Sequence, residues 1–170
     1  MVNVVSSIAL LLFPLLMAFA ASSDLLTMRI SNALVGILAL SFFAVALFVG
    51  MPLEQIGIHV LVGLVTLVVG FAFFAMRWVG GGDAKLAAAT GLWIGLGPLL
   101  PYLIYAALLG GALTLAVLGL RRLPLTPFLA RFAWLARLHD SKSGVPYGIA
   151  LAAAGILVYA RTDIFRHLIT

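Results

Sequence analysis

Six apolar runs, separated by short polar connections, account for most of the chain. Their approximate bounds are 4–22, 31–50, 56–76, 84–99, 101–120 and 145–161. A helix that crosses the hydrocarbon core of a bilayer needs about 17–25 predominantly apolar residues. The pattern therefore predicts an all-α integral membrane protein with about six transmembrane helices, arranged as a single polytopic domain over residues 1–170.

The first and fourth runs need separate treatment. A cleaved signal peptide begins with a positively charged segment, and no basic residue precedes the first run, so we interpret this run as a retained helix. The fourth run is short, and Pro98 and Pro101 lie at its end. If the fourth run crosses the bilayer, these prolines mark a tight turn into the fifth helix. The alternative is five spans, with the fourth run as a re-entrant segment.

Composition agrees with a membrane protein and removes several other classes. Hydrophobic residues make up 65% of the chain and charged residues 9%, whereas soluble domains average about 45–50% and about 25%. Cysteine is absent, which excludes disulfides, thiolate zinc sites and cysteine nucleophiles. The three histidines are scattered without metal-ligand spacing, so we expect no metal and no cofactor. The basic residues are not interleaved with aromatic ones on a soluble surface, so we expect no nucleic-acid partner.

Lys and Arg are distributed unevenly between the two sides of the predicted membrane domain. The connections 23–30, 77–85 and 121–143 fall on one side and hold eight basic residues, whereas the opposite side holds only Arg161 and Arg166. Cytoplasmic loops carry the excess of Lys and Arg in membrane proteins. The three connections are therefore predicted to lie in the cytoplasm, with both chain termini on the outer side.

The longest of these connections, 121–143, predicts a short amphipathic helix after Pro127. Such a helix would lie in the cytoplasmic interface between the fifth and sixth spans and anchor the protein to the lipid bilayer. The side chains expected to face acyl chains are Phe128, Phe132, Trp134 and Leu135, and those expected to face headgroups are Arg131 and Arg137.

Two of the chain's five carboxylates, Asp24 and Asp83, lie at ends of predicted spans. Asp24 follows the first span and Asp83 precedes the fourth, so the orientation above places both at the cytoplasmic boundary. Two neighbouring carboxyl groups share a proton because both cannot ionise cheaply. The ionised member can then activate a water molecule while the protonated member donates to a peptide carbonyl. Taken singly, Asp83 is equally well explained as a residue at a helix start, and Asp24 is better explained as a structural residue at a helix end; the pair predicts an aspartyl protease site.

The glycine run Gly80, Gly81 and Gly82 comes directly before Asp83. Without side chains, these residues would let the backbone of a peptide substrate approach Asp83, and they tolerate positive φ. Their backbone N–H groups, at the start of the fourth helix, could bind the substrate or the Asp83 carboxylate. The other glycine pairs, including Gly144 and Gly148, are interpreted as helix-packing positions.

Three segments resemble motifs of the type IV prepilin peptidases. Asp24, Arg29 and Asn32 match their D-x(4)-R-x-x-N signature, and the segment 80–85 matches G-x-G-D-x-K. Val145 to Gly148 resembles the P-Y-G step that enters their last helix. The likeness extends over nearly the whole chain and is greatest to the small members tied to tight-adherence (Flp) pilus systems. One departure is Ser31, which stands where the family usually has proline before the asparagine.

The resemblance implies an aspartyl endopeptidase of the bacterial inner membrane with its active site at the cytoplasmic face. Its substrates would be prepilins and pseudopilins, cleaved between a short basic leader and the apolar helix that follows, with the pilus assembly machinery as a further partner. Asp24 and Asp83 carry over as the catalytic pair. Long members also have a cysteine-rich zinc extension and methylate the new pilin terminus; this chain has no cysteines, so no methyltransferase activity is expected. Supporting positions without an assigned chemical role are Arg29, Asn32, Lys85, Pro146 and Tyr147.

Two other functions remain open from the sequence. A small proton-coupled transporter also uses membrane carboxylates, but it would need one deep within a span. A non-catalytic assembly subunit of a secretion machine would function without either aspartate.

Overall fold

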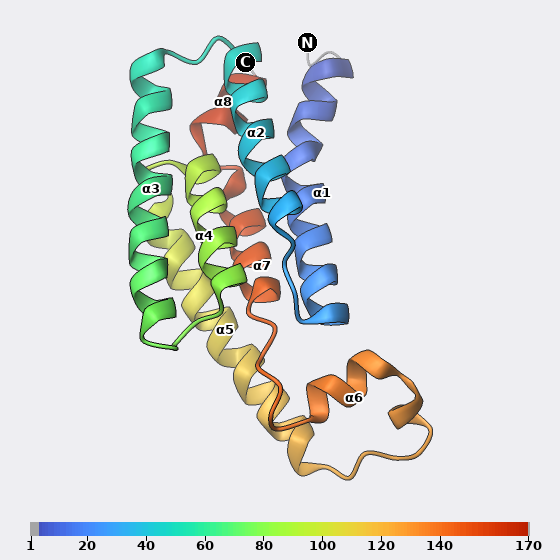
Figure 1. The fold of residues 1–170 in the computed structure, drawn as a ribbon. Helices are drawn as coiled ribbons and strands as arrows, with labels where there is room; N and C mark the ends of the chain where they lie inside the picture. Colours follow the sequence, from blue (N-terminus) through green and yellow to red (C-terminus); the bar gives the residue numbers. More distant parts are fainter. Residues whose placement is uncertain (1–3, 170) are drawn as a thin grey trace.

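The computed structural model describes residues 4–169, and within that range every regular element is a helix. The α-helices are α1 (Val4–Thr27), α2 (Asn32–Phe48), α3 (Leu53–Ala75), α4 (Gly81–Ile94), α5 (Leu99–Arg122), α6 (Ala133–His139), α7 (Gly148–Tyr159) and α8 (Asp163–Ile169). A short 3-10 turn, η1 (Leu129–Arg131), precedes α6. The prediction of an all-α membrane protein is confirmed (Figure 1).

Each of the six predicted spans corresponds to a helix, but six full crossings are not confirmed. Among the described residues, α1, α3 and α5 are the helices long and apolar enough to cross a membrane alone. A fourth crossing results if α7 and α8, bent by 47° at a short break, are one span. Helix α4 has 14 residues, which at 1.5 Å per residue gives about 21 Å, short of the roughly 30 Å hydrocarbon core. The re-entrant alternative for this segment therefore stays open.

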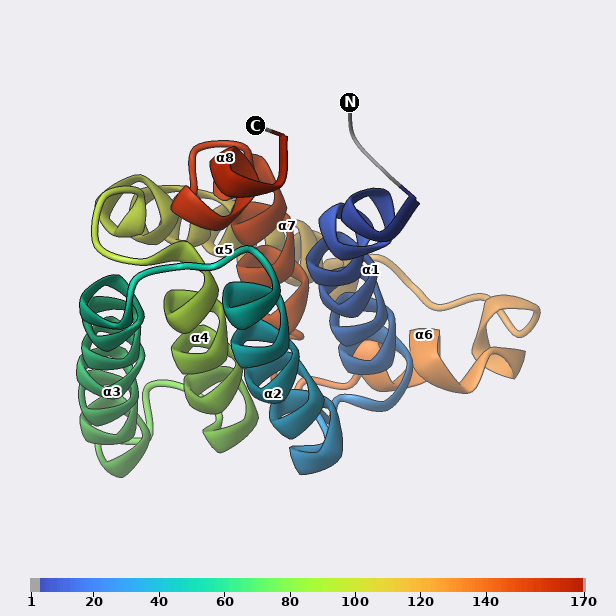
Figure 2. The same cartoon turned by 90° about the horizontal axis from the view of Figure 1, so that it is seen from above.

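Helix α4 is nevertheless the best-buried element of the bundle. It packs chiefly against α3, and also against α2 and α7 (Figure 2). The Trp93 side chain is fully buried and donates a 2.7 Å hydrogen bond from Nε1 to the backbone oxygen of Leu38 in α2. Its ring also lies 5.2 Å from that of Phe13 in α1. The interior of the bundle thus fixes α4, and with it the position of Asp83.

Both aspartates lie inside helices, which corrects their predicted positions. Helix α1 continues to Thr27, so Asp24 lies in its last turns rather than after it. The hydroxyl groups of the polar residues here form hydrogen bonds within the helix. Ser22 Oγ donates to the backbone oxygen of Ala18, and Thr27 Oγ1 donates to the backbone oxygen of Ser23. Helix α4 begins at Gly81, so Asp83 belongs to its first turn.

The predicted amphipathic helix in the 121–143 connection is only partly present. The segment is divided into η1 and α6, and it projects from one end of the bundle (Figure 1). Phe128 and Phe132 are exposed, as predicted for lipid contact, but Trp134 and Leu135 are half-buried. Helix α6 contacts α5 and α1, and the Arg137 guanidinium donates to the backbone oxygen of Leu26 in α1.

Helix α8 was not predicted. It begins after Thr162, whose side chain accepts a 3.2 Å hydrogen bond from the backbone N–H of Phe165 and so caps the helix. Helix α8 ends at the same end of the bundle where α1 begins (Figure 1). This agrees with the prediction that the two termini share one side.

Candidate active site

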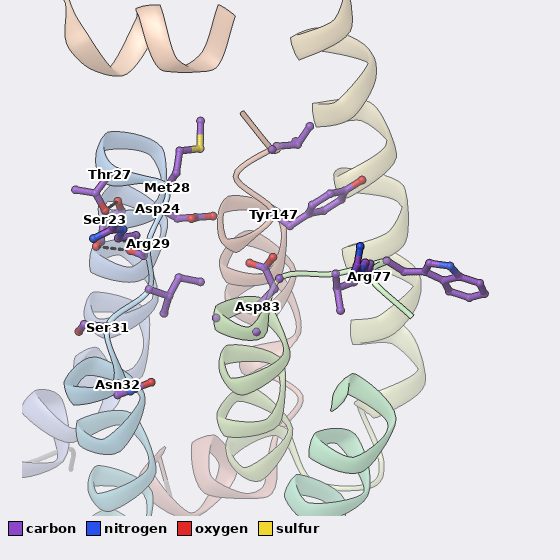
Figure 3. A pocket seen from close by; sticks show the side chains of 18 residues that line it. Ser23, Asp24, Thr27, Met28, Arg29, Ser31, Asn32, Arg77, Asp83 and Tyr147 are labelled. Carbon is purple, nitrogen blue, oxygen red and sulfur yellow. Dashed lines mark hydrogen bonds between the residues drawn. The ribbon is translucent and has the colours of Figure 1, made fainter. Parts of the chain in front are cut away.

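A pocket of about 840 Å³ opens at the end of the bundle opposite to the start of α1. The end of α1, the start of α4 and the segment before α7 all contribute to it. Asp24 and Asp83 both line the pocket and point into it from facing helices (Figure 3). The sequence prediction that the two carboxylates converge on one site therefore agrees with the geometry.

The Asp24 carboxylate is held by a hydrogen bond from the first residue of α7. Its side chain is 5% exposed, and its Oδ2 accepts a 2.7 Å hydrogen bond from the backbone N–H of Gly148. A Cβ atom on Gly148 would lie 2.7 Å from that same oxygen and 2.9 Å from Cδ1 of Ile30. Only glycine allows this close approach, so Gly148 positions Asp24. Sequence analysis did not assign Gly148 to the site; its spacing from Gly144 suggested helix packing.

Asp83 is the third residue of α4, and the glycine before the helix shapes its surroundings. Gly80 is the N-cap residue, with φ −73° and ψ 147°, and its backbone forms a hydrogen bond with the Asp83 carboxylate. This is one half of a capping box, in which the third side chain reaches back to the N-cap N–H. A Cβ atom on Gly80 would lie 2.9 Å from Oδ2 of Asp83. Gly80 therefore leaves room for the carboxylate that its own backbone binds.

Burial in the pocket shifts the pKa of the Asp83 carboxyl into the neutral range. Asp83 precedes the predicted span 84–99 and lines the solvent-open pocket. Burial, reinforced by the charge of Asp24, raises the pKa of the Asp83 carboxyl from 3.8 to about 7, and the Gly80 hydrogen bond offsets part of this rise. Two facing carboxyl groups, one protonated and one ionised, are the arrangement that aspartyl chemistry requires.

The glycine run does not use its conformational freedom. The glycines with positive φ in the described range are Gly50 and Gly95, so the tolerance of the run for positive φ is not used in this structure. Close packing explains it instead. A Cβ atom on Gly81 would lie 3.3 Å from the Phe74 ring, and one on Gly82 would lie 3.3 Å from Cβ of Ile30. All three glycines line the pocket, consistent with an open approach to Asp83.

Two of the supporting motif residues contact each other. Lys85 Nζ donates a 3.0 Å hydrogen bond to Oδ1 of Asn32. The contact joins the first turn of α2 to α4, and so relates the segment after Asp24 to the helix that carries Asp83. Arg29 lines the pocket, and its backbone oxygen accepts hydrogen bonds from Ser23 and Thr27.

The segment before α7 supplies the remaining supporting residues. The Tyr147 hydroxyl lies 2.8 Å from Oγ1 of Thr114 in α5, and a Cβ atom on Gly110 would lie 3.0 Å from the Tyr147 ring. Tyr147 lines the pocket, whereas Pro146 is buried behind it. These contacts lock the turn that presents the Gly148 N–H to Asp24.

Two further pocket residues have strained backbones. Met28 and Arg77 have φ angles of 54° and 60°, a region that non-glycine residues seldom adopt. Each follows the end of a long helix, α1 or α3, and each lines the pocket. No pattern in the sequence predicts this conformation. No group of three or more His, Cys, Asp or Glu side chains suited to a metal ion occurs within residues 4–169.

The pocket, its facing aspartates and the surrounding helices lie largely within a segment that a known family shares. The sequence model of the type IV leader peptidase family matches residues 11–115. The chain belongs to this family. No curated protein and no solved structure gave a significant match. As a type IV leader peptidase family member, the chain is a protease of the multi-pass membrane type, and the family implies prepilin substrates.

The matched range includes some parts of the pocket and leaves out others. Asp24, the glycine run and Asp83 lie inside it. Tyr147 and Gly148 lie beyond it, so the structure, rather than the leader peptidase family match, brings them to the site.

Proposed function

We propose that the protein is an aspartyl leader peptidase in which Asp24 and Asp83 form the catalytic pair. One observation carries the proposal: the two carboxylates, 59 positions apart in the sequence, line one solvent-open pocket from facing helices. The hydrogen bond from Gly148 to Asp24 and the raised pKa of Asp83 support it.

The proposed chemistry divides the work between the two aspartates. Asp83, in its protonated form, donates its proton to the oxygen of the scissile carbonyl. Asp24, ionised, takes a proton from water as the water oxygen attacks the carbonyl carbon. The tetrahedral diol then collapses: the C–N bond breaks, the leaving amine takes a proton from Asp24, and one diol hydroxyl returns its proton to Asp83 as its oxygen becomes the carbonyl of the new carboxyl group. No covalent enzyme intermediate and no cofactor is required.

The substrate we propose is an Flp-type prepilin or pseudopilin, cut between its basic leader and its apolar helix at the cytoplasmic side of the bacterial inner membrane. The orientation rests on the eight basic residues in the three connections at the pocket end of the bundle, against two at the other. A leader held in the cytoplasm and a helix held in the bilayer would meet at the depth of the two aspartates. Residues 1–170 would act as one membrane domain without methyltransferase activity.

Leader removal in cells tests this proposal. The protein would be co-expressed with an Flp-type prepilin in bacteria that lack their own leader peptidase, and leader loss scored by the shift in pilin mass. We expect Asp24→Asn and Asp83→Asn each to abolish processing, because either change removes a proton-transfer group at nearly constant shape. Glu54→Gln, an exposed carboxylate at the opposite end of the bundle, is the matched control and should process normally.

Full processing by either aspartate variant would overturn the catalytic pair, whereas no processing by the wild-type protein would favour a non-catalytic assembly role for the chain. Intact processing together with loss of a proton-coupled uptake would favour a transporter instead.

A further inference from the structure

An apolar groove runs from the active-site pocket along one side of the bundle. It has a volume of about 180 Å³ and lies between α3 and α5, with α4 and α7 beneath it. We call it the Asp83 groove and define it by Gly70, Ala84, Ala87, Leu103, Ala106 and Ala150. In the view from above, α3 and the first turns of α5 lie on the same side of the molecule (Figure 2).

The Asp83 groove is continuous with the candidate active site. Val79, Asp83 and Tyr147 line both the groove and the pocket. A polypeptide segment lying in the groove would therefore reach the Asp83 carboxylate at one end without crossing another helix.

The lining of the groove suits a helix and excludes a polar ligand. Apart from Asp83, its polar side chains are already engaged: Thr66 Oγ1 donates to the backbone oxygen of Val62, and the Tyr147 hydroxyl is bonded to Thr114. Five of the six defining residues are glycine or alanine. Small residues let helix backbones approach closely in lipid, where packing rather than water exclusion drives association. The rims are large exposed apolar side chains, including Val69, Phe73 and Leu103.

We propose that the Asp83 groove binds the apolar helix that follows the leader of the substrate. The inference rests on the proposed function and extends it from the chemistry to the recognition of the substrate. The substrate helix packs its backbone against the small residues of α4 and α7, with larger side chains between α3 and α5. Its cytoplasmic end, where the leader begins, then lies beside Asp83.

A second apolar groove offers an internal comparison. It lies between α2 and α3, has a larger volume of about 300 Å³, and is lined by residues that include Ala39, Gly63 and Lys85. It contacts neither aspartate, and its charged end is Lys85, which is bonded to Asn32. Volume alone would favour the α2/α3 groove as the binding site of the substrate helix. Continuity with the pocket that holds the two aspartates favours the Asp83 groove instead.

Site-directed cross-linking tests the proposal. Because the chain contains no cysteine, every cross-link to it must form at the cysteine that is introduced. Single cysteines would be introduced as Ala106→Cys in the Asp83 groove and as Ala39→Cys in the α2/α3 groove. Ala107→Cys is the matched control, because residue 107 is the exposed neighbour of residue 106 on α5. The probe is an Flp-type prepilin with one cysteine two turns into its apolar helix, and an added Asp83→Asn change keeps this probe uncleaved during bismaleimide treatment.

We expect the prepilin to cross-link at residue 106 at least about tenfold more than at 107 or 39. Equal yields at 106 and 107, a higher yield at 39, or no yield at 106 would each overturn the groove assignment. Cleavage of the same prepilin by the wild-type protein is measured in parallel. A cross-link at 106 without wild-type cleavage would uphold the docking and contradict the proposed function, so the two ideas fail separately.

Discussion

The backbone N–H of Gly148 donates a 2.7 Å hydrogen bond to Oδ2 of Asp24, across 124 positions of the chain. The helix that begins with Gly148, α7, packs along α1, which carries Asp24. The site therefore forms only when the beginning and the end of the chain have come together, and its geometry depends on a residue without a side chain.

Gly148→Ala is expected to lower leader cleavage by about 10²-fold, because misplacing a reacting group by about 1 Å costs that much. The new methyl group would lie 2.7 Å from Oδ2 of Asp24 and would displace the carboxylate. Gly111→Ala in α5, where a Cβ atom has no neighbour within 4 Å, is the control and should retain normal rates. Equal rates for the two variants in purified, detergent-solubilised protein would contradict this role of Gly148.

Gly80→Ala is expected to reduce cleavage without reducing thermal stability. Its methyl group would meet the end of the Asp83 side chain at 2.9 Å, so the carboxylate moves while the fold remains. Gly81→Ala meets only the edge of the Phe74 ring at 3.3 Å and should be milder. Cleavage rates and melting temperatures of both variants check this order. A larger loss of activity for Gly81→Ala would show that Asp83 is not the group disturbed.

The Lys85–Asn32 hydrogen bond predicts coupled effects of substitution. Lys85→Met and Asn32→Leu should each lower activity by a few fold, since a hydrogen bond of this kind contributes about 1 kcal/mol. The double variant should be no worse than either single one, because both remove the same contact. The measurement is a double-mutant cycle on cleavage rate. Additive losses would mean that Lys85 acts through another partner, such as a lipid phosphate.

The pH dependence of cleavage follows from Asp83. Burial and the neighbouring Asp24 raise the pKa of Asp83 to about 7, so this carboxyl is protonated below that pH and loses its proton above it. As the proton donor in the proposed chemistry, Asp83 should cause the cleavage rate to fall as pH rises through about 7. A rate profile of the protein in lipid vesicles measures this. A rate that stays constant well above pH 7 would assign the donor role elsewhere.

The sequence predicted the helices well because apolar runs are their direct cause, but it placed the helix ends poorly. A run stops where hydrophobicity stops, whereas α1 continues past residue 22 through Ser23 and Asp24. The side chains of both residues have hydrogen-bond partners, so the backbone has no reason to unwind. Helix α8 was not predicted because it is short and starts with a charged residue, so it has no long apolar run. Only the Thr162 cap indicates its start.

Within the site, the sequence could identify the aspartates but not what holds them. The basic-residue pattern placed Asp24 and Asp83 at one end of the bundle, and the structure agrees. Gly148 was read as a packing residue because its contact with Asp24 depends on the three-dimensional approach of α1 and α7. Ser31 departs from the family's usual proline, and the structure explains why the change is tolerated: its side chain accepts a 3.1 Å hydrogen bond from the N–H of Leu34 and caps α2.

The central claim is that Asp24 and Asp83 act as one catalytic pair. The most direct measurement is the rate of leader release from an Flp-type prepilin by the purified protein, its Asp24→Asn and Asp83→Asn variants, and the double variant, at equal amounts of folded protein. We predict that each single variant loses about 10²–10⁴-fold in rate, as expected for removal of a proton-transfer group, and that the double variant is no slower than the slower single one. A single variant that retains the wild-type rate would contradict the account.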